Sequence, residues 1–339
     1  MRLRLQKGCK LPSRTTIDVT DAKILKTLFK ESRTSFTEMA KDCKISVNAV
    51  RKRYKRLWKT GIINGEITQV NPASLGYKCI VTVWVTTAVA DESKTIEFLR
   101  SKPYSCKVFR NVFERANLAT IISLHEFEEL AKTMRDIEAN PLIKHTNAFI
   151  WSKASGMDHP ENLVLTPANS KTREESHPRL DTSKLEKAKI DDTDRQIAKI
   201  LSRSSRTTFT KIAEELNISA KNVIQRYNKL RGTVLANSTV TVSLKKLGYN
   251  AIASLRIKVA NRSKTPEILA NLLQIPNLIT VLEFVGGEYD LFPQIVLNDY
   301  EDLFKLKYKI SAIHGIEQLD VFLGKPFPAW PLNLFASLF

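Results

Sequence analysis

Apolar residues recur at helical spacing in three short blocks near the start of the chain. Thr20 is placed to cap a first helix, and Ser35 is placed to cap a second, shorter one. Ser46 is placed to cap a third helix over residues 47–59, which Gly61 ends. The pattern therefore predicts three consecutive short helices.

Strand-like runs follow the helices. Residues 62–70 and 78–89 are predicted to form a small hairpin, and three helices with a hairpin make a winged helix-turn-helix. Further along, residues 251–323 predict strand, helix, strand, strand, helix, strand. This βαββαβ order is the ferredoxin-like pattern, whose sheet has one bare face that usually pairs with another sheet.

The chain repeats itself. Residues 17–59 match residues 190–232 at an offset of 173, with identical residues at many positions. Asp18, Arg33 and Tyr54 are three of them. After the loss of one residue, the Leu-Gly-Tyr of residues 75–77 meets that of residues 247–249. We conclude that the chain is a tandem duplication of a unit of about 150 residues.

The predicted fold class is α+β, with two copies of a winged helix-turn-helix joined to a ferredoxin-like domain. The predicted parts are a basic N-terminal tail (1–16), a first winged helix-turn-helix (17–72) and ferredoxin-like domain (73–166), a linker (167–189), a second winged helix-turn-helix (190–244) and ferredoxin-like domain (245–325), and an apolar C-terminal tail (326–339). Below, copy one is residues 17–166 and copy two is residues 190–325.

Charge adds to this picture, because the chain has 53 Lys and Arg but only 35 Asp and Glu, which gives a net charge of +18. The excess lies in residues 1–70 (net +11) and 190–246 (net +6), whereas residues 71–170 are neutral and residues 247–339 carry −1. Two basic modules, each followed by a neutral one, favour a polyanionic partner. The alternative is a Lys-rich surface that only aids solubility, which predicts even spreading.

Several classes of protein and site are not indicated. No apolar stretch is long enough to span a membrane, and the N-terminus lacks the apolar core of a secretion signal, so we expect a cytoplasmic protein. The four cysteines stand far apart and form no CxxC or Cys/His cluster. We expect neither disulfides nor a metal site.

The third helix carries its charge on one face. At about 100° per residue, Asn48, Arg51, Lys52, Lys55 and Lys59 lie opposite an apolar face that docks on the other helices. A helix-turn-helix places this helix in the major groove, where cations neutralise phosphates and Asn or Arg can reach base edges. The alternative is an ordinary solvated face. Arg53 and Arg56 flank the core, where they can be structural.

Copy two keeps one cation at the corresponding positions, Lys221, with Gln225 and Asn228 as polar groups. We expect it to bind DNA more weakly, or only to act as a scaffold. The predicted DNA-contacting residues are Ser46, Asn48, Arg51, Lys52, Lys55, Lys59, Ser219, Lys221, Gln225 and Asn228.

These features together resemble the Lrp/AsnC family of archaeal and bacterial transcription regulators. The resemblance rests on SRTSFTEMAKDCKIS, the Leu-Gly-Tyr before the next strand, VGGEYDLFPQIV (285–296) and HGIEQLDVFL (314–323). It implies a ferredoxin-like (RAM-type) domain that dimerises and senses small molecules, often amino acids. By resemblance, Gly286, Gly287, Tyr289 and Asp290 form the effector-binding turn, whereas copy one has lost these residues. The alternative is a hairpin turn that only shapes an interface.

Enzyme motifs are not found. The five histidines do not match between the copies, and no phosphate loop, nucleophile elbow or metalloprotease motif occurs. We expect no enzyme and no cofactor. Fused siroheme decarboxylases are similar in architecture, but they would need a tetrapyrrole pocket lined by basic and His residues. An architectural DNA-binding protein without site preference is the other alternative.

The prediction is therefore a cytoplasmic, sequence-specific transcription regulator bound to double-stranded DNA. Its two halves are expected to pair as an intrachain pseudo-dimer that can associate further. The segment after Lys325 has no charged residue, and its three prolines within residues 326–331 predict an extended strap. It is expected to pack on its own domain, or to cross to the other copy or another chain.

Overall fold

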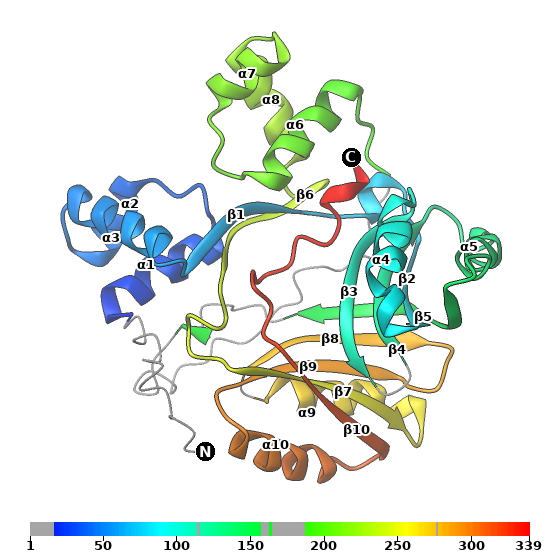
Figure 1. The fold of residues 1–339 in the computed structure, drawn as a ribbon. Helices are drawn as coiled ribbons and strands as arrows, with labels where there is room; N and C mark the ends of the chain where they lie inside the picture. The colour runs from blue at the N-terminus through cyan, green and yellow to red at the C-terminus, as the bar shows by residue number, and fades with distance from the viewer. Residues whose placement is uncertain (1–16, 114–115, 157–162, 165–186, 276) are drawn as a thin grey trace, which may run out of the picture.

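The computed structural model describes residues 17–113, 116–156, 163–164, 187–275 and 277–339. It confirms the α+β class with two helix-turn-helix modules and an antiparallel sheet (Figure 1). The two modules lie on the same side of the sheet. The basic tail 1–16 and most of the predicted linker lie outside the described residues. Within the described ranges, no helix has the length and apolarity needed to cross a bilayer.

The two copies have the same order of elements. Copy one contains α1 (Val19–Lys30), α2 (Phe36–Cys43), α3 (Val47–Lys59), β1 (Ile63–Val70), β2 (Cys79–Thr87), α4 (Glu92–Ser101), β3 (Ser105–Phe113), β4 (Ala116–Leu124), α5 (Glu129–Glu138) and β5 (Ile143–Gly156). Copy two contains α6 (Asp192–Arg203), α7 (Phe209–Leu216), α8 (Ala220–Leu230), β6 (Leu235–Val242), β7 (Ala251–Val259), α9 (Thr265–Leu273), β8 (Leu278–Val285), β9 (Leu291–Leu297), α10 (Glu301–Ser311) and β10 (Ile316–Gly324).

Side-chain caps fix where the helices of the modules begin. Ser35 and Ser46 cap α2 and α3 as predicted, each accepting a hydrogen bond from a backbone N–H in the first turn. The prediction of Thr20 as the cap of α1 is wrong. Asp18 occupies that position in a capping box with Asp21, and a carboxylate also suits the positive end of the helix dipole.

The predicted wing hairpin is also wrong. β1 does not pair with residues 78–89 but runs antiparallel to β6 of the other copy, so the two modules share one two-stranded ribbon (Figure 1). A 3-10 turn over Ala73–Leu75, followed by Gly76 at φ 91°, redirects the chain after β1. β2 then enters the large sheet, where most of its residues are buried.

The two βαββαβ halves join edge to edge into one sheet of eight strands. Its order is β10-β7-β9-β8-β5-β2-β4-β3, and the join is the antiparallel pair of β5 and β8. Side chains alternate across each strand. On β2, Val81 and Val83 pack under the helices with Leu99 of α4, whereas Ile80 and Trp84 face the other way. The pairing of the two halves within one chain agrees with the predicted pseudo-dimer.

Residues 326–339, which we call the C-terminal strap, cross from copy two to copy one and the modules (Figure 1). Trp330 exchanges backbone hydrogen bonds of 2.8 and 2.9 Å with Val242 at the end of β6. Ser337 donates to the carbonyl of Cys106 on β3 of copy one at 3.2 Å, and Phe335 is buried in the core of the second module. The strap therefore bridges the copies, which was one of the alternatives left open by the sequence.

Candidate nucleic-acid interface

Helix α3 is held on its module by a narrow apolar face. Val50 and Leu57 are buried there, in the core with α1 and α2. The face turned away from this core is exposed along its whole length. The exposed predicted residues of this face are Ser46, Asn48, Arg51, Lys52, Lys55 and Lys59. The structure thus brings an amide and four cations together on one solvent-facing surface.

The two arginines that flank the core are used inside the module. Asp21 of α1 is fully buried, and its carboxylate accepts hydrogen bonds from Arg53 (2.9 Å) and Arg56. Arg53 also bonds Asp18 at 2.6 Å, and the pKa of its guanidinium is raised by these two carboxylates. A buried carboxylate needs such partners, so α3 is fixed relative to α1.

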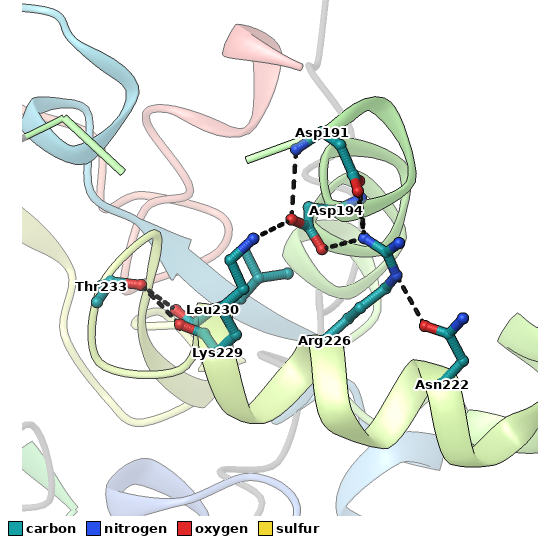
Figure 2. Close-up of polar contacts among 7 residues, drawn as sticks. All are labelled: Asp191, Asp194, Asn222, Arg226, Lys229, Leu230 and Thr233. Carbon is teal, nitrogen blue, oxygen red and sulfur yellow. Dashed lines mark hydrogen bonds and ion pairs between the residues drawn. The ribbon is translucent and has the colours of Figure 1, made fainter. Parts of the chain in front are cut away.

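Copy two repeats this arrangement, as Figure 2 shows. The buried carboxylate of Asp194 accepts hydrogen bonds from Lys229 (2.7 Å) and Arg226 (2.8 Å) of α8. Burial opposes ionisation of Asp194, but these bonds outweigh it and lower its pKa. Arg226 likewise lowers the pKa of Asp191.

The outward face of α8 differs from that of α3. The four predicted DNA-contacting residues of copy two are exposed, and only the lysine among them is charged: Ser219, Lys221, Gln225 and Asn228. Ile224, which replaces Arg51, is a 42% exposed apolar side chain. The two modules therefore present the same backbone framework with different chemistry.

The modules are locked together by a symmetric exchange of contacts. Arg33 donates to the carbonyls of Ser205 and Thr207, and Arg206 donates in return to those of Ser32 and Thr34. The hydroxyls of Ser32 and Ser205 meet between them at 2.6 Å, and both side chains are buried. We call this set the Ser-Arg lock.

Aromatic rings of the opposite module complete the lock. The Arg33 guanidinium lies 4.3 Å from the centroid of Phe209, and that of Arg206 lies 5.1 Å from the centroid of Phe36. Phe36 starts α2 and packs edge-on against Tyr54 of α3. The lock therefore reaches both helix-turn-helix units and sets their mutual orientation. Arg33 and Tyr54 were named above among the positions identical in both copies, but the sequence alone indicated no role for them.

The predicted effector turn has its side chains engaged within the chain. Asp290 is buried and accepts hydrogen bonds from the backbone N–H of Val259 (2.9 Å) and from Arg262 (2.7 Å). Tyr289 is buried and donates to Asp320 at 2.8 Å. Gly286 and Gly287 both have positive φ, and a Cβ on Gly287 would lie 3.0 Å from the Phe149 ring of copy one. The turn is thus part of the contact between the copies.

Both modules match known domain families. Residues 190–231 match the AsnC-type helix-turn-helix domain, and residues 17–64 match a winged helix-turn-helix DNA-binding domain. An uncharacterized HTH-type transcriptional regulator of Pyrococcus furiosus is 30% identical over 132 residues, which are 39% of this chain and 88% of that regulator. The chain belongs to the Lrp/AsnC-type helix-turn-helix family. It carries two such domains in one chain.

Other members of the Lrp/AsnC family share shorter stretches with it. HTH-type transcriptional regulator LrpA of Pyrococcus horikoshii is 44% identical over 90 residues, and LrpA of Pyrococcus abyssi is 43% identical over 90 residues. These residues are 25% of this chain, and the chain spans 64% of the length of either LrpA regulator.

The whole Lrp/AsnC-type tandem also resembles a solved structure. The siroheme decarboxylase NirDL superposes with a TM-score of 0.62 at 15% identity, covering 89% of each chain. At that identity the likeness concerns the fold. It shows that the tandem arrangement of two Lrp-like units, and not only the separate domains, occurs in another protein.

Proposed function

We propose that this chain is a transcription regulator that binds double-stranded DNA with α3 of copy one in the major groove. The observation that carries the proposal is the outward face of α3, where Arg51, Lys52, Lys55 and Lys59 are exposed beside Asn48. Cations on this face neutralise phosphates, and Asn48 is placed to hydrogen-bond base edges. The remaining arginines of α3 are held by Asp18 and Asp21, so the two sets of cations have separate roles.

Helix α8 adds a second, weaker contact in this proposal. Its exposed face offers Lys221 with the neutral groups of Gln225 and Asn228, so it supplies less charge and different hydrogen-bonding groups. Because the Ser-Arg lock fixes the two modules, both helices approach one DNA molecule as a unit. The preferred site is then an asymmetric sequence rather than a palindrome.

The proposal is tested by mapping bound sites across the genome and footprinting one of them. We expect discrete, asymmetric protected sites that are lost when Lys52 and Lys55 are replaced. Uniform protection without preferred sites would instead support an architectural DNA-binding protein. Loss of binding on replacing Lys221, with no effect of the α3 variants, would contradict the proposal.

A tetrapyrrole enzyme is the second candidate, favoured by the likeness to NirDL over the full chain. We propose that this chain is not such an enzyme. Basic residues line its large cavity, but no histidine is among the described lining residues, and the expected pocket would need both. Incubation of the purified protein with a tetrapyrrole tests this. An unchanged absorption spectrum of the pigment is expected, whereas a shifted spectrum followed by loss of carbon dioxide would reverse the choice.

An amino acid effector at the turn of Gly286, Gly287, Tyr289 and Asp290 is a further expectation from the family. The internal hydrogen bonds of Tyr289 and Asp290 favour the alternative, in which the turn shapes the contact between the copies. Calorimetry with a panel of amino acids distinguishes the two. Saturable heat that Asp290→Ala abolishes in a folded protein would favour the effector site.

A further inference from the structure

A large hollow lies between the bare faces of the two ferredoxin-like halves. Its volume is about 1010 Å³, at the upper end of the range of about 300–1,000 Å³ typical of small-molecule sites. Side chains from both copies line it, including Ile80 and Trp151 of copy one and Ile252 and Phe322 of copy two. The strand alternation that buries one face under the helices turns these residues inward.

The hollow is a bounded space. Towards one end, the two bare faces meet in an aromatic cluster in which Trp84 lies 5.9 Å from Phe292 and Phe149 lies 5.2 Å from Phe284, measured between ring centroids. On another side the C-terminal strap forms a wall, to which Phe327, Trp330 and other strap residues contribute. The hollow is partly open to solvent, so it is a cleft that a small molecule can enter and not a sealed packing defect.

Charge is found at the rim and not inside. The basic residues among the described lining residues are all exposed: Lys78, Arg110, Lys153, Lys187 and Lys325. Lys78 pairs with Glu126 at 2.7 Å, and the side chain of Lys187 lies against Gly76. Lys153 and Lys325 have no ion pair with another described residue. Glu92 is the acidic residue among the described lining residues, and Arg110 already pairs with it at 3.3 Å. The lining between these charges is aromatic and aliphatic, with a few neutral polar groups such as Thr82 and Gln294.

We propose that this hollow binds an amphipathic small molecule with a large apolar body and a single anionic group. The body lies among the aromatic and aliphatic side chains, where apolar surface leaves water. The anionic group lies at the rim, where Lys153 and Lys325 supply charge-assisted hydrogen bonds.

The site is tested without DNA, so its failure is separable from that of the proposed function. The probes are the fluorescent aromatic sulfonate ANS, and the matched pair of oleate and oleyl alcohol, which share one body and differ in charge. We expect ANS to bind with saturation at one site per full-length chain. We expect oleate, kept below its micellar concentration, to displace it competitively, and oleyl alcohol to do so at least about five-fold less well.

Two variants locate the binding. Ile80→Trp adds volume to a half-buried side chain that faces the hollow, and it should remove ANS binding and oleate competition. Lys153→Glu with Lys325→Glu should weaken oleate at least about five-fold and leave oleyl alcohol unchanged. Lys94→Glu with Lys305→Glu changes the net charge equally on exposed lysines of α4 and α10 and should leave both ligands unchanged.

Circular dichroism and denaturant unfolding confirm that each variant is folded. ANS binding that does not saturate would overturn the site. ANS binding that a folded Ile80→Trp protein retains would also overturn it. Equal weakening of oleate and oleyl alcohol by the rim variant would overturn the assignment of the anionic group to Lys153 and Lys325.

Discussion

Removing two lysines from the outward face of α3 should change how DNA affinity depends on salt. Each phosphate that a protein neutralises contributes about −0.9 to the slope of log affinity against log salt. The four exposed cations of α3 can contribute at most about −3.6 to this slope, whereas Lys221 of α8 can contribute about −0.9. The double variant Lys52→Ala/Lys55→Ala should therefore reduce the magnitude of the slope by about 1.8.

The size of this effect is easily measured. Between about 50 and about 200 mM salt, the wild type should lose about 12-fold more affinity than the double variant, since four raised to 1.8 is about 12. Fluorescence anisotropy with a labelled duplex at several salt concentrations gives both slopes. Lys94→Ala/Lys305→Ala is the matched control, because it removes the same charge from exposed lysines away from both modules. Equal slopes for the double variant and the wild type would refute the placement of α3 on the DNA.

Three further changes should act on stability. Asp194→Asn should lower the free energy of unfolding by about 1.5–3 kcal/mol, because Lys229 and Arg226 lose their shared carboxylate. Since Asp194 has a lowered pKa when folded, its contribution is present above the unfolded value of about 3.9 and is lost as pH falls, so the wild type should lose more stability in acid than the variant. Truncation after Lys325 should lower the melting temperature. The number of chains per particle in solution should not change, because the strap bridges the two copies within one chain. Asp290→Ala should cost about 1.5–3 kcal/mol in denaturant unfolding, because the buried N–H of Val259 loses its acceptor; unchanged stability would return the turn to the effector hypothesis.

The sequence was sufficient where local spacing decides the structure. Helix α3 begins after Ser46 because a serine hydroxyl there caps the helix, and the apolar spacing of Val50 and Leu57 determines which face is buried. The same reasoning placed the exposed cations of α3. The order of strands and helices in the ferredoxin-like halves followed from periodicity alone, because each element is long enough to show its period.

Contacts between distant segments were harder to predict. The pairing of β1 with β6 joins residues far apart in the sequence, and alternation along β1 is equally compatible with a local hairpin. The Ser-Arg lock was visible only as residues identical in both copies, a pattern that a conserved core position also produces. The cap of α1 was predicted wrongly because both Asp18 and Thr20 are residue types that can cap a helix.

The shared β1–β6 ribbon makes the pairing of the two helix-turn-helix modules independent of protein concentration. When two separate subunits must associate, dilution separates them, and the fraction able to contact DNA with both units falls with it. Here the two units belong to one chain, so the association is intramolecular at every concentration. A few molecules per cell would hold the same fraction of paired modules as many. Under the proposed function, and for a chain that acts alone, the occupancy of a DNA site at low protein concentration would rise with the first power of that concentration.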